Sequence, residues 1–355
     1  MKKKLLFVIK SQFGYHLDTY KYCMYLKNSW DITYICFDNG KIKRNAEGLN
    51  IIYISNKSNF FLRAIHFYVN IIKEIYYNDY SLIFINYFNP CFIIKLLFWR
   101  KKFILDIRSG SVTKNKYKNR LNNYLIKFNS LFFKNISIIS KSLANYLKIN
   151  NYTVVPVGAE QISTNNKNFN KFELLYIGTL VNRRIEETIQ GLYLFMNMVK
   201  SSSIKYHIFG SGESEKYQLL KIINKLTLQD NVIYHGYKTH DEMQEFFDKC
   251  NVGISYIPIT NYYNYQPPTK TFEYILSGMV CVATNTPENQ RIINGENGIL
   301  CKDNSQSFAN ALNEVYKKRK SYDSYNIRLT MKHYEWKNII YNIFEPFIQM
   351  VIAEN

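Results

Sequence analysis

Short, continuous apolar runs alternate with longer amphipathic stretches along nearly the whole chain of 355 residues. A continuous apolar run is typical of a strand buried on both faces, and the amphipathic stretches are typical of helices that cover a sheet. We therefore predict an α/β fold with two doubly wound parallel sheets, because the length fits two domains. The predicted strands are 5–9, 32–37, 51–54, 82–87, 103–107, 136–139 and 153–155, then 173–177, 205–209, 232–235, 252–256, 280–284 and 298–301, and helical patterns include 186–199, 215–226, 241–249 and 305–318.

A polar, Asn-rich segment at 161–171 separates the two sets of strands and is predicted to be an interdomain linker. It divides an N-terminal domain, 1–160, from a C-terminal domain, 172–332. Residues 333–355 are predicted to form a last helix that packs back on the N-terminal domain. The basic and apolar start, MKKKLLFVIK, is predicted to be a buried strand rather than a signal peptide, because its apolar run is short.

The two halves of the chain differ strongly in charge. Residues 1–160 hold 25 Lys or Arg against 8 Asp or Glu, whereas residues 161–355 hold 21 against 19. A basic half is expected to meet an anionic partner, which leaves nucleic acid, a membrane surface or a phosphorylated substrate open. The six cysteines form no C-x-x-C pair, so neither a zinc site nor a disulfide framework is expected, and a reducing compartment fits.

An ordered series of short motifs begins near residue 172. The motifs are LLYIGTL (174–180), NRR (182–184), HIFGSGE (207–213), VIYHG (232–236), NVGISYIP (251–258), PPTKTFEYILSG (267–278) and VCVAT (280–284). In this order and spacing they resemble the nucleotide-binding domain of retaining glycosyltransferases with two Rossmann-like domains, the GT-B fold, and in particular glycosyltransferase family 4. The first half is similar more loosely, through Gly14 and the sequence DIR at 106–108.

The resemblance implies an enzyme that moves a sugar from a nucleotide-sugar to an acceptor hydroxyl, with retention, in a cleft between the domains. It implies neither a metal nor a cofactor, and no D-x-D triplet lies between the strands. The implied acceptor is a saccharide or a lipid-linked sugar in bacterial surface polysaccharide synthesis of the O-antigen or capsule type. Two alternatives stay open: a nucleic-acid-binding protein that uses the basic, aromatic first half, and a nucleotide-sugar epimerase of related architecture.

The resemblance also assigns donor-binding residues. Glu273 corresponds to a glutamate that accepts hydrogen bonds from both ribose hydroxyls, which suits two carboxylate oxygens. Lys270, one turn earlier, reaches Glu273 or the donor. A cationic pair, Arg183 and Arg184, is expected to hold the diphosphate, and Arg184 is the preferred catalytic candidate because neutralising the leaving group lowers the barrier. The remaining donor-binding candidates are Gly178, Gly210 and Gly212, which follow strands at tight turns.

Fewer candidates come from the first half. Gly14 is expected to let a loop approach the donor, and His16 beside it is a weak acceptor-binding candidate or a plain helix-start residue. Asp106 and Arg108 end a predicted strand, so they either contact sugar or acceptor as catalytic groups, or form a pair that braces the loop. In place of the first glutamate of the family's usual pair, Tyr265 stands eight residues before Glu273.

Basic and aromatic residues are interleaved in the helical patterns of the first half. Such a surface suits anionic lipid, with aromatic rings at the level of the headgroups. We therefore expect a cytoplasmic protein that binds peripherally to the inner face of the membrane, with no nucleic-acid partner. The proposed membrane-facing cations are Lys95, Arg100, Lys101, Lys102 and Lys116.

Overall fold

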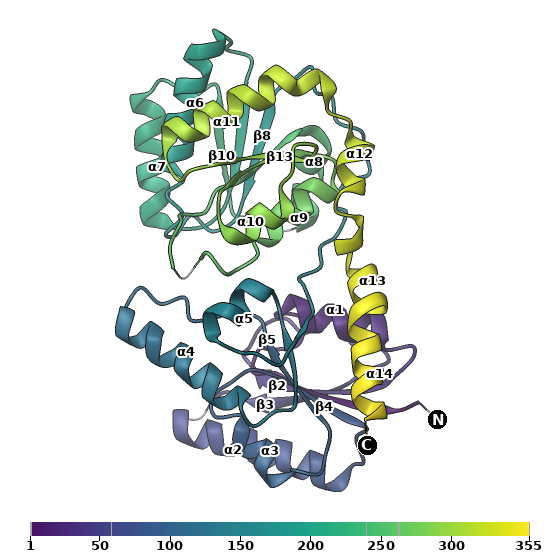
Figure 1. The fold of residues 1–355 in the computed structure, drawn as a ribbon. Helices are drawn as coiled ribbons and strands as arrows, with labels where there is room; N and C mark the ends of the chain where they lie inside the picture. The colour runs from purple at the N-terminus through teal and green to yellow at the C-terminus, as the bar shows by residue number, and fades with distance from the viewer. Residues whose placement is uncertain (1, 58, 239, 262, 355) are drawn as a thin grey trace. The chain divides into compact units, whose positions relative to one another are not determined.

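The computed structural model describes residues 2–57, 59–238, 240–261 and 263–354, which form two compact units (Figure 1). Unit 1 combines residues 1–157 with residues 336–355, and unit 2 comprises residues 158–335. All strand pairs that the structure describes inside the two sheets are parallel. The predicted α/β class with two doubly wound parallel sheets is therefore confirmed.

Unit 1 is built on a seven-stranded sheet in the order β3-β2-β1-β4-β5-β6-β7. Helices α2, α3 and α4 gather along one side of this sheet (Figure 1). The strands are β1 (Lys4–Val8), β2 (Asp31–Asp38), β3 (Asn50–Ser55), β4 (Leu82–Asn86), β5 (Phe103–Ile107), β6 (Asn135–Ile138) and β7 (Thr153–Val154), and the helices are α1 (Leu17–Leu26), α2 (Phe60–Tyr77), α3 (Phe92–Leu97), α4 (Lys116–Ser130) and α5 (Lys141–Leu147).

Unit 2 is built on a six-stranded sheet in the order β10-β9-β8-β11-β12-β13. Helices α6, α7 and α11 cover one face, and α8, α9 and α10 cover the other (Figure 1). The strands are β8 (Glu173–Ile177), β9 (Lys205–Phe209), β10 (Val232–Gly236), β11 (Val252–Ser255), β12 (Val280–Thr284) and β13 (Gly298–Cys301), and the helices are α6 (Glu186–Val199), α7 (Glu213–Lys225), α8 (His240–Lys249), α9 (Thr269–Leu276), α10 (Pro287–Ile292), α11 (Ser305–Lys318) and α12 (Ser324–Leu329), with 3-10 turns η1 (Arg319–Ser321) and η2 (Lys332–Tyr334).

The end of the chain returns to unit 1. The residues from Trp336 form α13 (Trp336–Ile339), a π-helical turn η3 (Ile340–Phe344) and α14 (Glu345–Ala353). The ring of Phe344 stacks on Tyr22 of α1, with centroids 3.9 Å apart, and the indole nitrogen of Trp30 donates to Glu345 at 2.7 Å. These contacts pack η3 and the start of α14 on unit 1.

The polar segment at 161–171 is packed on unit 2. The ammonium of Lys167 donates to the hydroxyl of Ser163 at 2.9 Å and to the carbonyl of Phe247. The hydroxyl of Ser163 in turn donates to Asp248 at 2.6 Å. Burial accordingly lowers the pKa of Lys167 to about 8. Among the described residues, no helix is long and apolar enough to cross a bilayer.

Candidate functional site

The carboxyl end of β8 lies where the second sheet changes its winding direction. The chain passes from β8 to β9 on one side and returns through α8 to β11 on the other. Open parallel sheets bind ligands at such switch points. Gly178 follows β8 here with φ of +150°, and Gly210 follows β9. A Cβ on Gly210 would lie 2.1 Å from the carbonyl oxygen of Gly178, so the two loops touch backbone to backbone.

Helix α9 brings a cation and a carboxylate to this point. A Cβ on Gly178 would lie 2.7 Å from Nζ of Lys270, which also lies 4.2 Å from the ring centroid of Tyr176. Glu273 follows one helical turn after Lys270, so the two share a helix face. The structure thus brings Gly178, Lys270, Glu273 and Gly210 together at one end of the sheet.

The local sequence explains why α9 lies so close to the sheet. The hydroxyl of Thr271 donates to Ser255 of β11 at 2.7 Å. The ring of Tyr274 packs directly on Gly253, where a Cβ would lie 2.3 Å from the ring, and its hydroxyl accepts from the backbone N–H of Ile177 at 2.8 Å. These contacts fix the first turn of α9 beside the end of β8.

Both charges on α9 are held in an unfavourable environment. Burial raises the pKa of Glu273 to about 7, and the nearby carboxylate of Glu160 adds to this effect. Burial lowers the pKa of Lys270 to about 7, with Arg183 adding to the shift. Perturbed groups of this kind are typical of binding and catalytic sites. A ligand that supplies hydroxyl donors to Glu273 and negative charge to Lys270 would stabilise both ions.

Arg183 belongs to this cluster. Its guanidinium lies 4.2 Å from the ring centroid of Tyr263, and it acts electrostatically on Lys270. Its Nη1 atom is buried and has no hydrogen-bond partner within the described part of the chain. A planar guanidinium with an unused donor is suited to a phosphate oxygen.

Arg184 lies differently from its neighbour. It adopts φ of +54°, donates through Nη2 to Glu187 at 2.6 Å, and lies 3.6 Å through Nη1 from Asp303. Its side chain is exposed and paired with carboxylates. The geometry therefore favours Arg183, rather than the preferred Arg184, as the cation that meets a ligand beside Lys270.

Gly212 begins α7 with φ of +141°. A Cβ there would lie 3.0 Å from a carboxylate oxygen of Glu215 in the first turn of the helix. This carboxylate lies next to the amino end of α7, where an anion would otherwise meet the backbone N–H groups. Of the predicted glycines in unit 2, Gly178 and Gly210 stay the candidates for a phosphate-binding turn.

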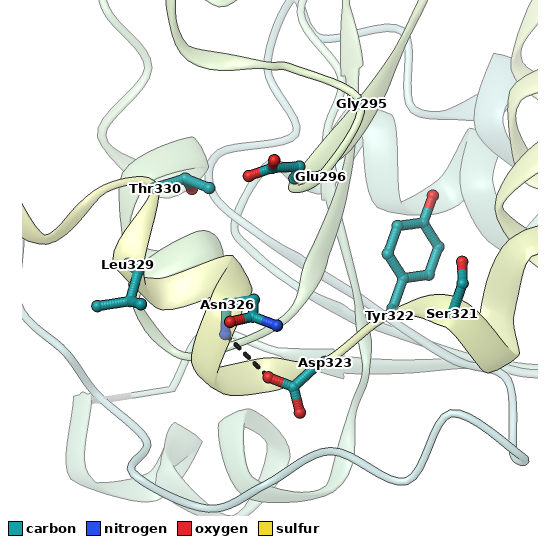
Figure 2. Close-up of a pocket in the computed structure, with 8 residues that line it drawn as sticks. All are labelled: Gly295, Glu296, Ser321, Tyr322, Asp323, Asn326, Leu329 and Thr330. Atoms are coloured by element: carbon teal, nitrogen blue, oxygen red, sulfur yellow. Dashed lines mark hydrogen bonds between the residues drawn. The ribbon is translucent and has the colours of Figure 1, made fainter.

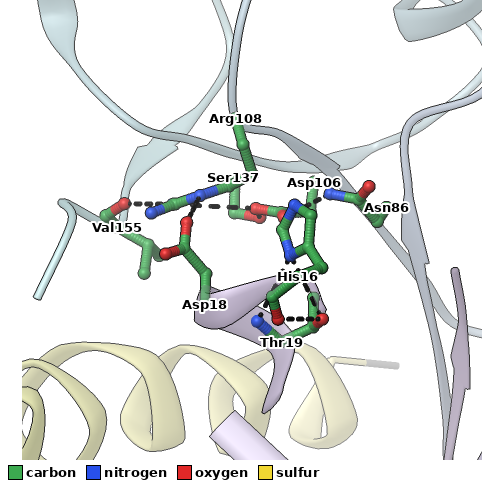
Figure 3. Close-up of polar contacts among 8 residues, drawn as sticks. All are labelled: His16, Asp18, Thr19, Asn86, Asp106, Arg108, Ser137 and Val155. Carbon is green, nitrogen blue, oxygen red and sulfur yellow. Dashed lines mark hydrogen bonds and ion pairs between the residues drawn. The ribbon is translucent and has the colours of Figure 1, made fainter. Parts of the chain in front are cut away.

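Asp106 and Arg108 form a buried polar network in unit 1 (Figure 3). Asp106 accepts from Ser137 at 2.7 Å and from Asn86 at 3.1 Å, and it has no exposed surface. Burial raises the pKa of Asp106, although the charge of Arg108 opposes this shift. The carboxylate is therefore satisfied inside the protein.

Arg108 connects β5 to α1 and to the segment after β7. It donates to the carboxylate of Asp18 and, at 2.6 Å, to the carbonyl of Val155. Burial opposes its charge, but Asp18 holds the pKa of Arg108 above the ordinary value. These contacts are those of a pair that braces the loop. Sequence reasoning missed Asp18, because an acid in the first turn of a helix has an ordinary role there.

Gly14 and His16 lie in the segment that joins β1 to α1, and β1 is the switch point of the first sheet. His16 is the N-cap of α1, and its Nδ1 lies 3.1 Å from the hydroxyl of Thr19 (Figure 3). Gly14 has φ of +88°, and a Cβ there would lie 2.4 Å from the side chain of Arg44. Arg44 was not predicted; its proximity to Gly14 adds a cation to this end of the sheet.

The predicted membrane-facing cations have different surroundings. Lys102 donates to the carbonyls of Ile352 and Glu354, and Lys95 donates to the carbonyls of Trp99 and Lys101. The ammonium groups of these two lysines therefore donate to backbone carbonyls of the protein itself, which leaves them less available to a lipid headgroup. Lys101 pairs with Asp79 at 2.6 Å, whereas Arg100, over the ring of Trp99, and Lys116, at the start of α4, are exposed.

A pocket of about 630 Å³ lies elsewhere in unit 2, between α12 and the turn before β13 (Figure 2). Its lining includes the carboxylates of Glu296 and Asp323, and neither Lys nor Arg is among its lining residues. Asp323 caps α12 by accepting from the backbone N–H of Asn326 at 2.9 Å. The lining therefore lacks the cations that a diphosphate needs, and it includes none of the predicted donor residues.

Comparisons with known proteins concern the fold and the second half of the chain. Residues 171–318 match the family model described as glycosyl transferases group 1. No curated protein sequence matches the chain significantly.

Solved structures share the fold over the full chain. They include sucrose-phosphate synthase from Thermosynechococcus elongatus (TM-score 0.75, 14% identity, 99% of this chain and 100% of that chain) and Anabaena HepE in complex with UDP and glucose (0.74, 13%, 98% and 100%). The lipopolysaccharide outer core galactosyltransferase WaaB is also similar (0.71, 15%, 98% and 99%). The fold is therefore that of the GT-B glycosyltransferases.

Proposed function

We propose that this chain, which carries a group 1 glycosyltransferase domain over residues 171–318, transfers a sugar from a nucleoside diphosphate sugar to an acceptor hydroxyl. The observation that carries the proposal is the grouping of Lys270, Glu273 and Arg183 around Gly178 at the end of β8. Anabaena HepE has been solved with UDP and with UDP-glucose, which favours a donor of this chemical type.

Each group has a role that follows from its chemistry. Lys270 and Arg183 bind the diphosphate, because both cations are partly desolvated and Arg183 has an unused donor. Glu273 accepts hydrogen bonds from the two ribose hydroxyls. The diphosphate gains negative charge as it leaves, so the two cations stabilise the transition state more than the ground state.

The reaction breaks the bond between the anomeric carbon and the diphosphate oxygen and forms a bond from that carbon to the acceptor oxygen. The acceptor oxygen attacks on the same face of the sugar that the diphosphate leaves, so the configuration is retained. The acceptor proton passes to the leaving phosphate, so the step needs no protein nucleophile or base. The stereochemistry is tested by the anomeric proton coupling of the product. A product of inverted configuration would contradict this part of the proposal, and an epimerised nucleotide-sugar without transfer would favour an epimerase.

The donor site is tested by calorimetric binding of UDP-glucose and other nucleotide-sugars to matched variants. Glu273→Gln is expected to weaken the best ligand by about 100-fold, since the negative charge and one of the two acceptor oxygens are lost and an amide NH2 donor replaces that oxygen. Arg183→Met is expected to lower kcat/KM by about 100-fold, and Arg184→Met by less than tenfold. A larger effect at Arg184 would restore the original preference for that residue. Unchanged binding in Glu273→Gln would refute the site.

We propose a lipid-linked acceptor for surface polysaccharide of the O-antigen or capsule type, reached from an anionic membrane. Exposed apolar and aromatic side chains on and near α2, α3 and α4 support this partner. Phe60 is 77% exposed and Phe61 is 72% exposed in α2, and Trp99 after α3 and Tyr117 in α4 are also exposed. We call this surface the α2–α4 face. Large rings with nearby cations such as Arg100 suit the headgroup region.

Vesicle sedimentation tests the membrane partner. The double variant Phe60→Ser with Phe61→Ser is expected to lose most binding to vesicles that contain phosphatidylglycerol, while nucleotide-sugar affinity stays unchanged. Tyr237→Ser is the control, because Tyr237 is equally exposed in unit 2. Equal vesicle binding by both variants would reject the α2–α4 face, and salt-sensitive binding to oligonucleotides alone would favour the nucleic-acid alternative.

A further inference from the structure

Three different metal-ligating side chains meet in unit 2, apart from the cluster around Gly178. Glu173 is the first residue of β8, His207 lies in β9, and Cys250 lies between α8 and β11. All three are buried, and one ligand atom from each lies within 4.8 Å of the others. Glu173 and His207 point to the same face of the sheet, since Leu175 of β8 pairs with His207 in the register.

Two of these ligand atoms lack hydrogen-bond partners. Glu173 is 7% exposed and His207 is 5% exposed, yet within the described residues neither Oε2 of Glu173 nor Nε2 of His207 has a hydrogen bond. The two atoms face each other at 4.0 Å, which is too long for a hydrogen bond. Buried polar atoms are normally satisfied, but Oε2 of Glu173 has only an ion pair with Lys249 at 3.3 Å, and Nε2 of His207 has no hydrogen bond within the described residues.

The surroundings of His207 orient its ring. Nδ1 lies 3.0 Å from Nε2 of His235, so a single proton is shared between the two rings. When Nδ1 carries this proton, Nε2 presents a lone pair toward Glu173 and Cys250. A histidine that donates through one nitrogen and presents the other to a cluster has the usual arrangement of a metal ligand with its supporting partner.

We propose that Glu173, His207 and Cys250 bind one Zn²⁺ ion that joins β8, β9 and the connection before β11. A carboxylate oxygen, an imidazole nitrogen and a thiolate sulfur are all ligands of zinc. Tetrahedral zinc places its ligand atoms about 3.5 Å apart, so the cluster contracts by about 1 Å when the ion binds. The Cys250 thiol releases its proton to solvent as the sulfur–zinc bond forms.

Lys249 is the competitor for this site. Its Nζ lies 3.3 Å from Oε2 of Glu173, and its side chain is 47% exposed. The ion displaces this ammonium, which moves into solvent. Zinc affinity therefore depends on the charge at residue 249, and Lys249→Met is expected to raise it by about tenfold.

Full-length, tag-free protein is stripped with a chelator and titrated with Zn²⁺ against a chromophoric competitor, and separately with Co²⁺. The wild-type chain is expected to bind one equivalent, to gain several degrees in Tm, and to show a thiolate-to-cobalt charge-transfer band. Cys250→Ser loses the band and at least 100-fold in affinity. The control is Cys301→Ser, because Cys301 is buried in the same unit outside the cluster and is expected to change neither.

Three results would overturn the proposal: less than one equivalent of zinc, a cobalt spectrum without the charge-transfer band, or equal affinities in Cys250→Ser and the wild type. If circular dichroism shows that Cys250→Ser does not fold, Lys249→Met serves as the test, because the Lys249 side chain is 47% exposed and its replacement leaves the core intact. An unchanged or lower zinc affinity in Lys249→Met would contradict the proposed site. These readouts do not involve sugar transfer, so their failure is distinct from failure of the proposed function.

Discussion

Replacing Arg108 with methionine distinguishes a bracing role from a catalytic one. The Arg108 side chain is 7% exposed, and its partners Asp18 and Asp106 are 12% and 0% exposed. Removing one partner of a buried ion pair costs about 3–5 kcal/mol, because the remaining charge stays buried without compensation. A domain of ordinary stability has about 5–15 kcal/mol in total, so Arg108→Met is expected to remove a large part of the stability of unit 1.

Tryptophan fluorescence during urea unfolding measures this effect selectively, because Trp30, Trp99 and Trp336 all belong to unit 1. With a slope of about 2 kcal/mol per molar urea, the midpoint is expected to fall by about 2 M. The matched control is Arg120→Met, an identical change at an exposed position of α4, which is expected to cost less than about 0.5 kcal/mol. A loss below about 1 kcal/mol in Arg108→Met, together with lost turnover, would refute the bracing role.

Two further predictions concern unit 2. Gly210→Ala is expected to lower Tm by several degrees in a thermal unfolding scan, because its Cβ would lie 2.1 Å from a backbone oxygen; an unchanged Tm would show that the loops separate easily. In Glu273→Gln, nucleotide-sugar affinity is expected to fall as Lys270 loses its proton, with a midpoint below about pH 7, because the Glu273 charge that raises the pKa of Lys270 is removed. In Lys270→Met, affinity is expected to rise as Glu273 ionises, with a midpoint above about pH 7, because the Lys270 charge that lowers the pKa of Glu273 is removed. Calorimetry across this pH range checks both slopes, and identical profiles in the two variants would contradict the assigned titrations.

Most of the fold followed from the sequence because its signals are local. The predicted helices at 186–199 and 305–318 coincide with α6 and α11. Their signals are the apolar periodicity within each segment and, for α11, the N-cap residue Asn304 directly before it. The parallel sheets followed from continuous apolar runs. These features need no knowledge of which residues meet across long distances.

The candidate site was harder to predict, because the partner of a charge is set by tertiary structure. Arg183 and Arg184 are adjacent and chemically identical, yet the left-handed backbone of Arg184 turns its side chain to Glu187 and Asp303. Lys102 likewise meets carbonyls that lie 250 and 252 residues away. Composition shows that the excess positive charge lies in the first half, but it does not show which cations already have partners within the folded protein.

The return of residues 336–355 to unit 1 has a consequence for the order of folding during synthesis. Unit 1 is discontinuous, and its ring stack between Tyr22 and Phe344 joins the beginning of the chain to its end. The ribosome makes all of unit 2 before it makes Phe344. Helix α1 therefore lacks the ring of Phe344 until the residues after unit 2 have been made, and unit 1 can be completed only after the whole of unit 2 has been synthesised.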